Sequence, residues 1–73
     1  LPDVESLRLI GVLQDVKVSR ALFEDFNGYA YILQVGDRVK NGFLVSITED
    51  YVTFQIRQYG WSRKIALTLE EEI

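Results

Sequence analysis

Hydrophobic and polar residues alternate along most of this chain. Segment 51–57 shows the pattern most clearly, because Val52, Phe54 and Ile56 share one face and polar residues occupy the positions between them. A two-residue period is typical of a β-strand with one buried face. No segment repeats its apolar residues at helical spacing over three turns, and β-branched and aromatic residues are frequent throughout. We therefore predict an all-β protein.

The pattern predicts about six short, mostly antiparallel strands. We expect them at 7–14, 19–24, 29–35, 43–48, 51–57 and 64–69, with 38–40 as a short crossing segment and 58–62 as a loop. Within 43–48 the period places Phe43, Val45 and Ile47 on one side. The strands are separated by residues that tolerate positive φ or favour tight turns: Gly28, Gly36, Asp37, Asn41 and Gly42.

These strands predict a small single-domain β-sandwich or a partly open β-barrel. A single flat sheet would leave a large apolar face in water, so the strands must cover one another. We divide the chain into an entry segment at 1–6, a β-domain at 7–69 and an acidic tail at 70–73. A chain of 73 residues buries only about 60% of the surface that its unfolded form exposes, which limits it to one core.

Composition argues against catalysis and against nucleic-acid binding. The chain has no cysteine and no histidine, which removes thiol nucleophiles, disulfides, the usual zinc sites and the side chain best suited to proton transfer. The net charge is −3 and the 8 basic residues are scattered, whereas phosphate backbones are bound by clustered Lys and Arg. We expect no catalytic residues, no cofactor and no metal.

Two motifs carry an alternative chemical interpretation. Glu24-Asp25 and Glu49-Asp50 are paired carboxylates that could divide acid and base roles, but both pairs fall at predicted turns, where solvated acids are common. Five aromatic residues could form a stacking platform for single-stranded nucleic acid, at Tyr29, Tyr31, Tyr51, Tyr59 and Trp61. Without interleaved basic charge, core packing and scattered surface positions are the favoured interpretation.

The first half of the chain is apolar on both faces. If Leu9, Leu13, Phe23 and Leu33 fill the core, a second set of residues points the other way. This set, with Arg8 beside it, is our candidate partner-binding surface: Arg8, Ile10, Val12, Leu22 and Ile32. Either barrel closure covers this second face, or a partner docks on it, with the first strand as a possible edge for strand addition.

A set of short motifs in a fixed order resembles the C-terminal β-domain of the type IV pilus assembly protein PilP family. The motifs are SLRLIGVLQ at 6–14, Ala21-Leu22-Phe23, Gly28, Val35-Gly36-Asp37, Asn41-Gly42, Val45-Ser46-Ile47 with Val52, and Trp61 before Ala66-Leu67-Thr68-Leu69. The pattern is also similar to the homology region of the type II secretion protein GspC. The opening strand and the late Trp61 with its Ala-Leu-Thr-Leu strand favour PilP.

The resemblance implies a non-enzymatic connector in the periplasm. Proteins of the PilP family are inner-membrane lipoproteins whose extended N-terminal part joins PilN and PilO, while the β-domain reaches the N-terminal domains of the outer-membrane secretin PilQ. We therefore expect this chain to be a domain of a longer protein, with the lipid-bearing cysteine and the extended segment outside it. A GspC homology region docking its own secretin, and less favourably a small nucleic-acid-binding barrel, remain the alternatives.

Overall fold

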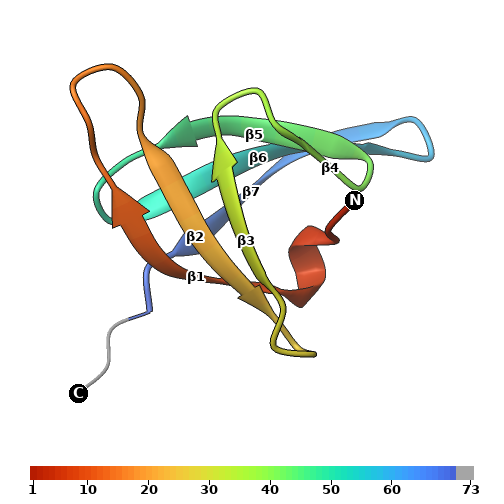
Figure 1. Cartoon of the computed structure of the whole chain (residues 1–73). Helices are drawn as coiled ribbons and strands as arrows, with labels where there is room; N and C mark the ends of the chain where they lie inside the picture. Colours follow the sequence, from red (N-terminus) through yellow and green to blue (C-terminus); the bar gives the residue numbers. More distant parts are fainter. Residues whose placement is uncertain (71–73) are drawn as a thin grey trace.

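Seven antiparallel strands and one short 3₁₀ helix form the fold in this computed structural model, which describes residues 1–70 (Figure 1). The elements are η1 (Val4–Ser6), β1 (Leu7–Leu13), β2 (Arg20–Asp25), β3 (Ala30–Gln34), β4 (Arg38–Val39), β5 (Gly42–Ile47), β6 (Tyr51–Gln58) and β7 (Trp61–Thr68). The predicted all-β fold is confirmed. The seventh strand is the two-residue β4, which lies in the predicted crossing segment.

The strands form two antiparallel sheets, one ordered β1-β2-β3 and the other β4-β5-β6-β7. Figure 1 shows the first sheet lying across the second, so that the strands of the two layers cross at a steep angle. Every connection within a sheet joins strands that are adjacent in sequence. Local hairpins therefore account for both sheets, and the sandwich depends on how the two pack together.

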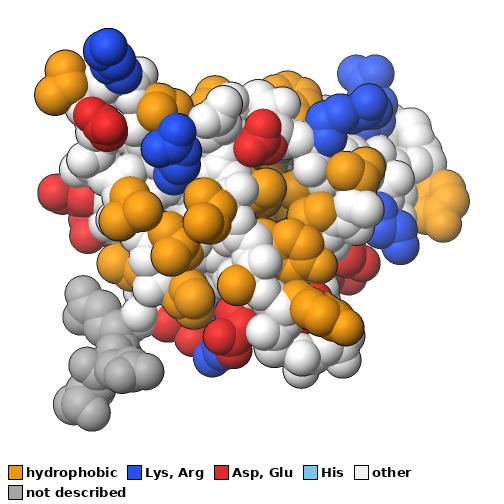
Figure 2. Space-filling view, in the orientation of Figure 1, with side chains coloured by type: hydrophobic (Ala, Val, Ile, Leu, Met, Phe, Trp, Pro, Cys, Tyr) orange, Lys and Arg blue, Asp and Glu red, His pale blue; other side chains and the backbone are white. Residues whose placement is uncertain are grey.

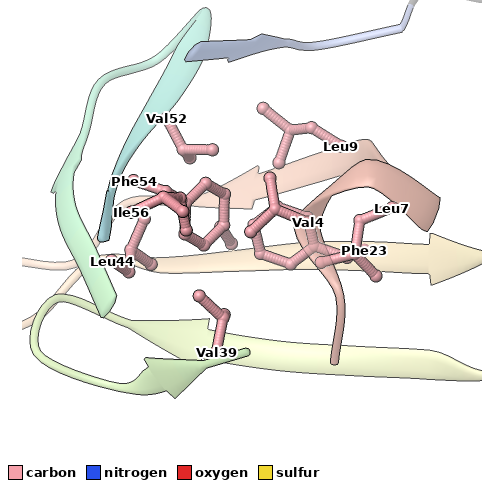
Figure 3. Close-up of a cluster of buried hydrophobic side chains, with 10 residues drawn as sticks. Val4, Leu7, Leu9, Phe23, Val39, Leu44, Val52, Phe54 and Ile56 are labelled. Carbon is pink, nitrogen blue, oxygen red and sulfur yellow. The ribbon is translucent and has the colours of Figure 1, made fainter. Parts of the chain in front are cut away.

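The core lies between the two sheets and is entirely apolar. Ten buried hydrophobic residues form it: Val4, Leu7, Leu9, Ala21, Phe23, Val39, Leu44, Val52, Phe54 and Ile56. Figure 3 shows these side chains converging from both layers. At its centre the rings of Phe23 and Phe54 lie 5.7 Å apart between centroids at an interplanar angle of 53°, a tilted arrangement favourable for aromatic pairs.

Hydrogen bonds join the two sheets at two seams. At the first, the Gly36 amide donates to the Leu44 carbonyl (2.8 Å) and the Leu44 amide donates to the Asp37 carbonyl (2.9 Å), which ties the turn after β3 to β5. At the second, the Glu70 amide donates to the Leu9 carbonyl (3.0 Å), which ties the end of β7 to β1. Because these hydrogen bonds join the two sheets, the sandwich is partly closed, as a barrel is.

The entry segment 1–6 is part of the folded domain. The Asp3 side chain accepts a hydrogen bond from the Glu5 amide (3.0 Å) and caps η1, whose Val4 is buried in the core. The Lys40 amide donates to the Pro2 carbonyl (2.8 Å). Of the predicted tail 70–73, Glu70 is bound to β1, and 71–73 lie outside the described residues.

Two β-bulges change which side chains face the core. In β1 the pairing with β2 steps from Leu9 to Gly11, so Ile10 is an extra residue and the alternation after it is inverted. Leu13 is consequently 58% exposed, and Val12 packs against the core. The prediction that Leu13 lies in the core and Val12 outside it was wrong, because a strict two-residue period cannot register an inserted residue.

The second bulge lies in β5, where the pairing with β6 steps from Leu44 to Ser46 and leaves Val45 as the extra residue. Leu44 and Ile47 both face the core as a result, and Phe43 is 45% exposed. Our expectation that Phe43 and Ile47 share a face was wrong for the same reason as in β1.

Two turns also differ from prediction. β6 and β7 extend through most of the predicted loop 58–62 and meet at Tyr59-Gly60, where φ is 51° and 79°, as in a type I′ hairpin turn. At the Asn41-Gly42 step only Asn41 has a positive φ, of 65°. Gly42 is instead required for close approach, because a Cβ atom there would collide with the Gln55 carbonyl oxygen.

We expect Phe54→Ala to destabilise the protein by about 3–5 kcal/mol, because it opens a cavity beside Phe23 at the centre of the only core in the described residues. Urea denaturation followed by circular dichroism measures this change. Phe26→Ala is the matched control, because Phe26 is 78% exposed and should shift the free energy of unfolding by less than about 0.5 kcal/mol. Equal effects of the two substitutions would contradict the placement of the core.

Candidate protein-docking surface

The outer face of sheet β1-β2-β3 carries an exposed apolar cluster. Leu22 of β2 pairs with Gly11 of β1 on one side and with Ile32 of β3 on the other, and the bulged Ile10 lies next to Gly11. Ile10 is 40% exposed and Ile32 is 61% exposed, while Leu22 is half-buried between them. We define these residues, together with the outward Leu13, as the β1–β3 face: Ile10, Leu13, Leu22 and Ile32.

Figure 2 shows hydrophobic side chains gathered over this sheet, which faces the viewer in Figure 1. No element of the described residues covers them. Closure of the fold at its two seams joins the edges of the sheets and leaves the outer faces open. Of the two alternatives left by the sequence, burial of this second face by barrel closure therefore does not apply to Ile10 and Ile32.

A charged group borders the β1–β3 face. The Arg8 guanidinium lies 2.7 Å from a Glu24 carboxylate oxygen and 3.3 Å from a Glu70 carboxylate oxygen, and all three side chains are partly exposed. Ion pairs this accessible to water contribute little to stability. They do place hydrogen-bonding groups at the border of an apolar patch, and an apolar centre with a polar rim is the usual anatomy of a protein interface.

The structure places four of the five predicted partner-binding residues on the outer face of the sheet: Arg8, Ile10, Leu22 and Ile32. The fifth, Val12, pairs with the buried Ala21 and packs against the core, so it does not belong to this face. Leu13 takes its place and was missed. No local sequence signal marks it, because its orientation follows from the bulge at Ile10.

The structure places both paired carboxylates at or beside turns. Glu24 binds Arg8 on the outer face. The Asp25 carboxylate accepts hydrogen bonds from the amides of Asn27 (2.9 Å) and Tyr29 (3.0 Å), which holds the turn between β2 and β3. At the other pair, the Thr48 hydroxyl accepts from the amides of Asp50 and Tyr51, so this turn is held by a neighbouring side chain.

Asp25 also accepts a hydrogen bond from the Tyr31 hydroxyl (3.4 Å). Desolvation, followed by the charge of this carboxylate, raises the pKa of Tyr31 above its ordinary value. The phenol therefore stays protonated at neutral pH and acts as a donor. The predicted turn at Gly36-Asp37 is held in a similar way, because the Asp37 carboxylate accepts from the Gln34 amide (2.9 Å).

The exposed aromatic residues do not form one platform. Tyr59 and Trp61 lie together at the tip of the β6–β7 hairpin, where they line a shallow hollow with Arg63. Tyr51 begins β6 at the opposite end of the same hairpin, and Tyr29 lies at the turn before β3. Within residues 1–70 there is no cluster of three metal-ligating side chains and no helix long enough to cross a membrane.

Comparison of this chain with protein-family models and with curated proteins found no match. The evidence that bears on function is therefore the geometry of the β1–β3 face and the resemblance of the ordered motifs.

We expect Ile32→Asp to leave the domain folded, with a loss of less than about 1 kcal/mol, because Ile32 projects into water. Val12→Asp should cost more than about 2 kcal/mol, because it brings a carboxylate against the apolar core. Urea denaturation of the two variants separates surface from core positions. A larger loss of unfolding free energy for Ile32→Asp than for Val12→Asp would contradict the inward orientation of Val12 that follows from the bulge at Ile10.

Proposed function

We propose that this chain is a non-enzymatic protein-docking domain that serves as a periplasmic connector of the type IV pilus machinery. In this role it links the inner-membrane alignment complex, through PilN and PilO, to the N-terminal domains of the outer-membrane secretin PilQ. The observation that carries the docking role is the exposed apolar β1–β3 face with its charged border. The assignment to the pilus rests on the resemblance to PilP, with which the two-sheet all-β fold is compatible.

Binding on this face would combine apolar burial with rim hydrogen bonds. Ile10, Leu13 and Ile32 each retain exposed surface that a partner could cover, at about 25 cal/mol per Å² of apolar area removed from water. Arg8 already holds two carboxylates and can orient a polar group of the partner. Because tethering to a membrane assembly raises the effective concentration, an affinity of about micromolar for the isolated domains would suffice.

A homology-region domain of a type II secretion GspC protein is the second candidate, because the same ordered motifs are similar to that domain. It differs in the secretin that it would bind. In both cases the full-length protein would be held at the inner membrane, and the domain described here would act in the periplasm without touching the lipid.

The test is an NMR titration of the ¹⁵N-labelled chain with the N-terminal domains of a PilQ secretin. We expect amide shifts concentrated on the β1–β3 face, and a loss of affinity of about tenfold or more in Ile32→Asp, because a desolvated carboxylate would oppose apolar docking. Val16→Asp is the matched control, because Val16 is fully exposed in the loop between β1 and β2.

Each outcome of this titration discriminates between the candidates. Binding to a type II secretin domain with no binding to PilQ domains would favour the GspC alternative. No interaction with either secretin, or equal effects of the substitutions at Ile32 and Val16, would refute docking through this face.

A further inference from the structure

The outer edge of β7 is open over most of its length. The Leu69 amide donates to the Asp50 carbonyl of the chain preceding β6 (2.8 Å), so the odd-numbered residues of this strand direct their backbone groups toward β6. The even-numbered residues therefore direct theirs away from the sheet. Near its end this edge approaches β1, and just beyond β7 the Glu70 amide donates to the Leu9 carbonyl. The amide and carbonyl groups of Ser62, Lys64 and Ala66 have no backbone partner among residues 1–70.

Unpaired cations lie on the outer face of the same sheet. Arg38 pairs with the exposed Phe43 across β4 and β5, and Lys64 pairs with Gln55, next to Arg57, across β6 and β7. None of the three cations has a carboxylate within 4.0 Å among residues 1–70. Figure 2 shows Lys and Arg side chains gathered at the end of the molecule that carries β4 and the β6–β7 turn.

Arg38 and Arg57 contribute to a common shallow depression beside Phe43, and a neighbouring depression joins Phe43 and Arg57 to Ser62 at the β7 edge. The strand positions on this face carry no acidic side chain. The three cations therefore give this face a positive charge up to the open edge, although the chain as a whole has a net charge of −3.

The opposite side of the edge carries Trp61, Arg63 and Ile65. Trp61 is 77% exposed and lines a hollow of about 240 Å³ beneath the hairpin tip with Ile56, Gln58, Tyr59 and Arg63. The Arg63 guanidinium lies 3.4 Å from a Glu5 carboxylate oxygen, so its charge is paired. Ile65 follows on the same side of β7 and is half-buried against the core. A strand added beside β7 would thus meet Lys64 and Arg57 on one face, and on the other Trp61 and Ile65 with the Glu5-paired Arg63 between them.

The positive charge beside the β7 edge discriminates between two possible added strands, a second copy of β7 and an acidic segment of a partner. A second copy of β7, paired antiparallel about Lys64, would bring a second Lys64 beside Lys64 and Arg57, and like charges on facing strands oppose pairing. An acidic segment meets no such repulsion. We propose that β7 accepts an extended acidic segment of a partner protein as an added strand, with carboxylates facing Lys64 and Arg57 and apolar residues facing Trp61 and Ile65.

This strand site is separate from the β1–β3 face, since it lies on the other sheet. Either site could therefore fail its test without affecting the other. Binding at the two sites would shift the NMR signals of different backbone amides. Backbone hydrogen bonds would supply affinity and the alternation of charge would set the register of the added strand.

The test uses the intact chain and a blocked ten-residue peptide of alternating Glu and Val. In an NMR titration at pH 7 we expect shifts along β7, slower hydrogen exchange at the amides of Ser62, Lys64 and Ala66, and weaker binding at higher salt. Lys64→Glu should weaken binding by about tenfold or more. Lys17→Glu makes the same charge change in the loop between β1 and β2 and should have a much smaller effect.

Ala66→Pro tests the edge itself. Its amide points away from β6, so proline removes a donor that the added strand needs while the β6–β7 ladder is kept. We expect a folded protein, by circular dichroism, that no longer protects the β7 amides in the presence of the peptide. If Ala66→Pro destabilises the fold, the comparison of Lys64→Glu with Lys17→Glu still tests whether the peptide binds at β7.

The peptide titration overturns the proposal if the peptide does not bind, if Ala66→Pro leaves binding intact, if shifts are confined to the β1–β3 face, or if binding does not protect the β7 amides. Displacement of the peptide by an oligothymidine of equal charge at equal concentration would also overturn it, because the positive surface would then be a nucleic-acid site. Concentration-dependent dimerisation of the free chain through β7 would show that a second copy is the occupant.

Discussion

The whole domain depends on one layer of apolar packing between two small sheets. Neither sheet can be stable in water alone, because each presents an apolar face that only the other covers. Phe23 and Phe54 meet at the centre of this layer, and eight further buried residues surround them. The seams at Gly36–Leu44 and Leu9–Glu70 hold the sheets in the alignment that this contact requires. Every other feature of the protein is positioned relative to this layer.

A single thin core also explains why so much apolar surface stays outside. A chain of 73 residues has too little material for a third layer, so hydrophobic residues that do not face the partner sheet face water. Ile10, Leu13 and Ile32 gather on one sheet in this way, while Phe43 and Trp61 lie on the other. The two outer surfaces differ in charge, since Arg8 is paired with two acids, whereas Arg38, Arg57 and Lys64 have no carboxylate within 4.0 Å among residues 1–70. We infer two docking sites of different chemistry on one small scaffold.

The bulges connect the core to these surfaces. At Ile10 and Val45 an inserted residue turns the following side chains over, so that each strand contributes both to the core and to the outside. The bulge in β1 brings Leu13 to the β1–β3 face and withdraws Val12 from it. The bulge in β5 turns Ile47 toward the core, on the same side as Leu44 before it, and places Ser46 on the outer face. A change that removed either bulge would therefore alter a surface and the core together.

The sequence by itself determined the all-β class, the alternation in β6 that puts Val52, Phe54 and Ile56 inside, and turns such as Gly28 and Gly36, because periodicity and positive φ are local properties. It also indicated four of the five residues proposed on the outer face of the first sheet. Only the tertiary structure decided the orientation of Val12 and Leu13, the burial of Val4, the hydrogen bond from Glu70 to β1, and the open edge of β7. Bulges, seams and free edges are set by pairing between distant segments, and a one-residue change in register moves side chains to the other face without leaving a local trace in the sequence.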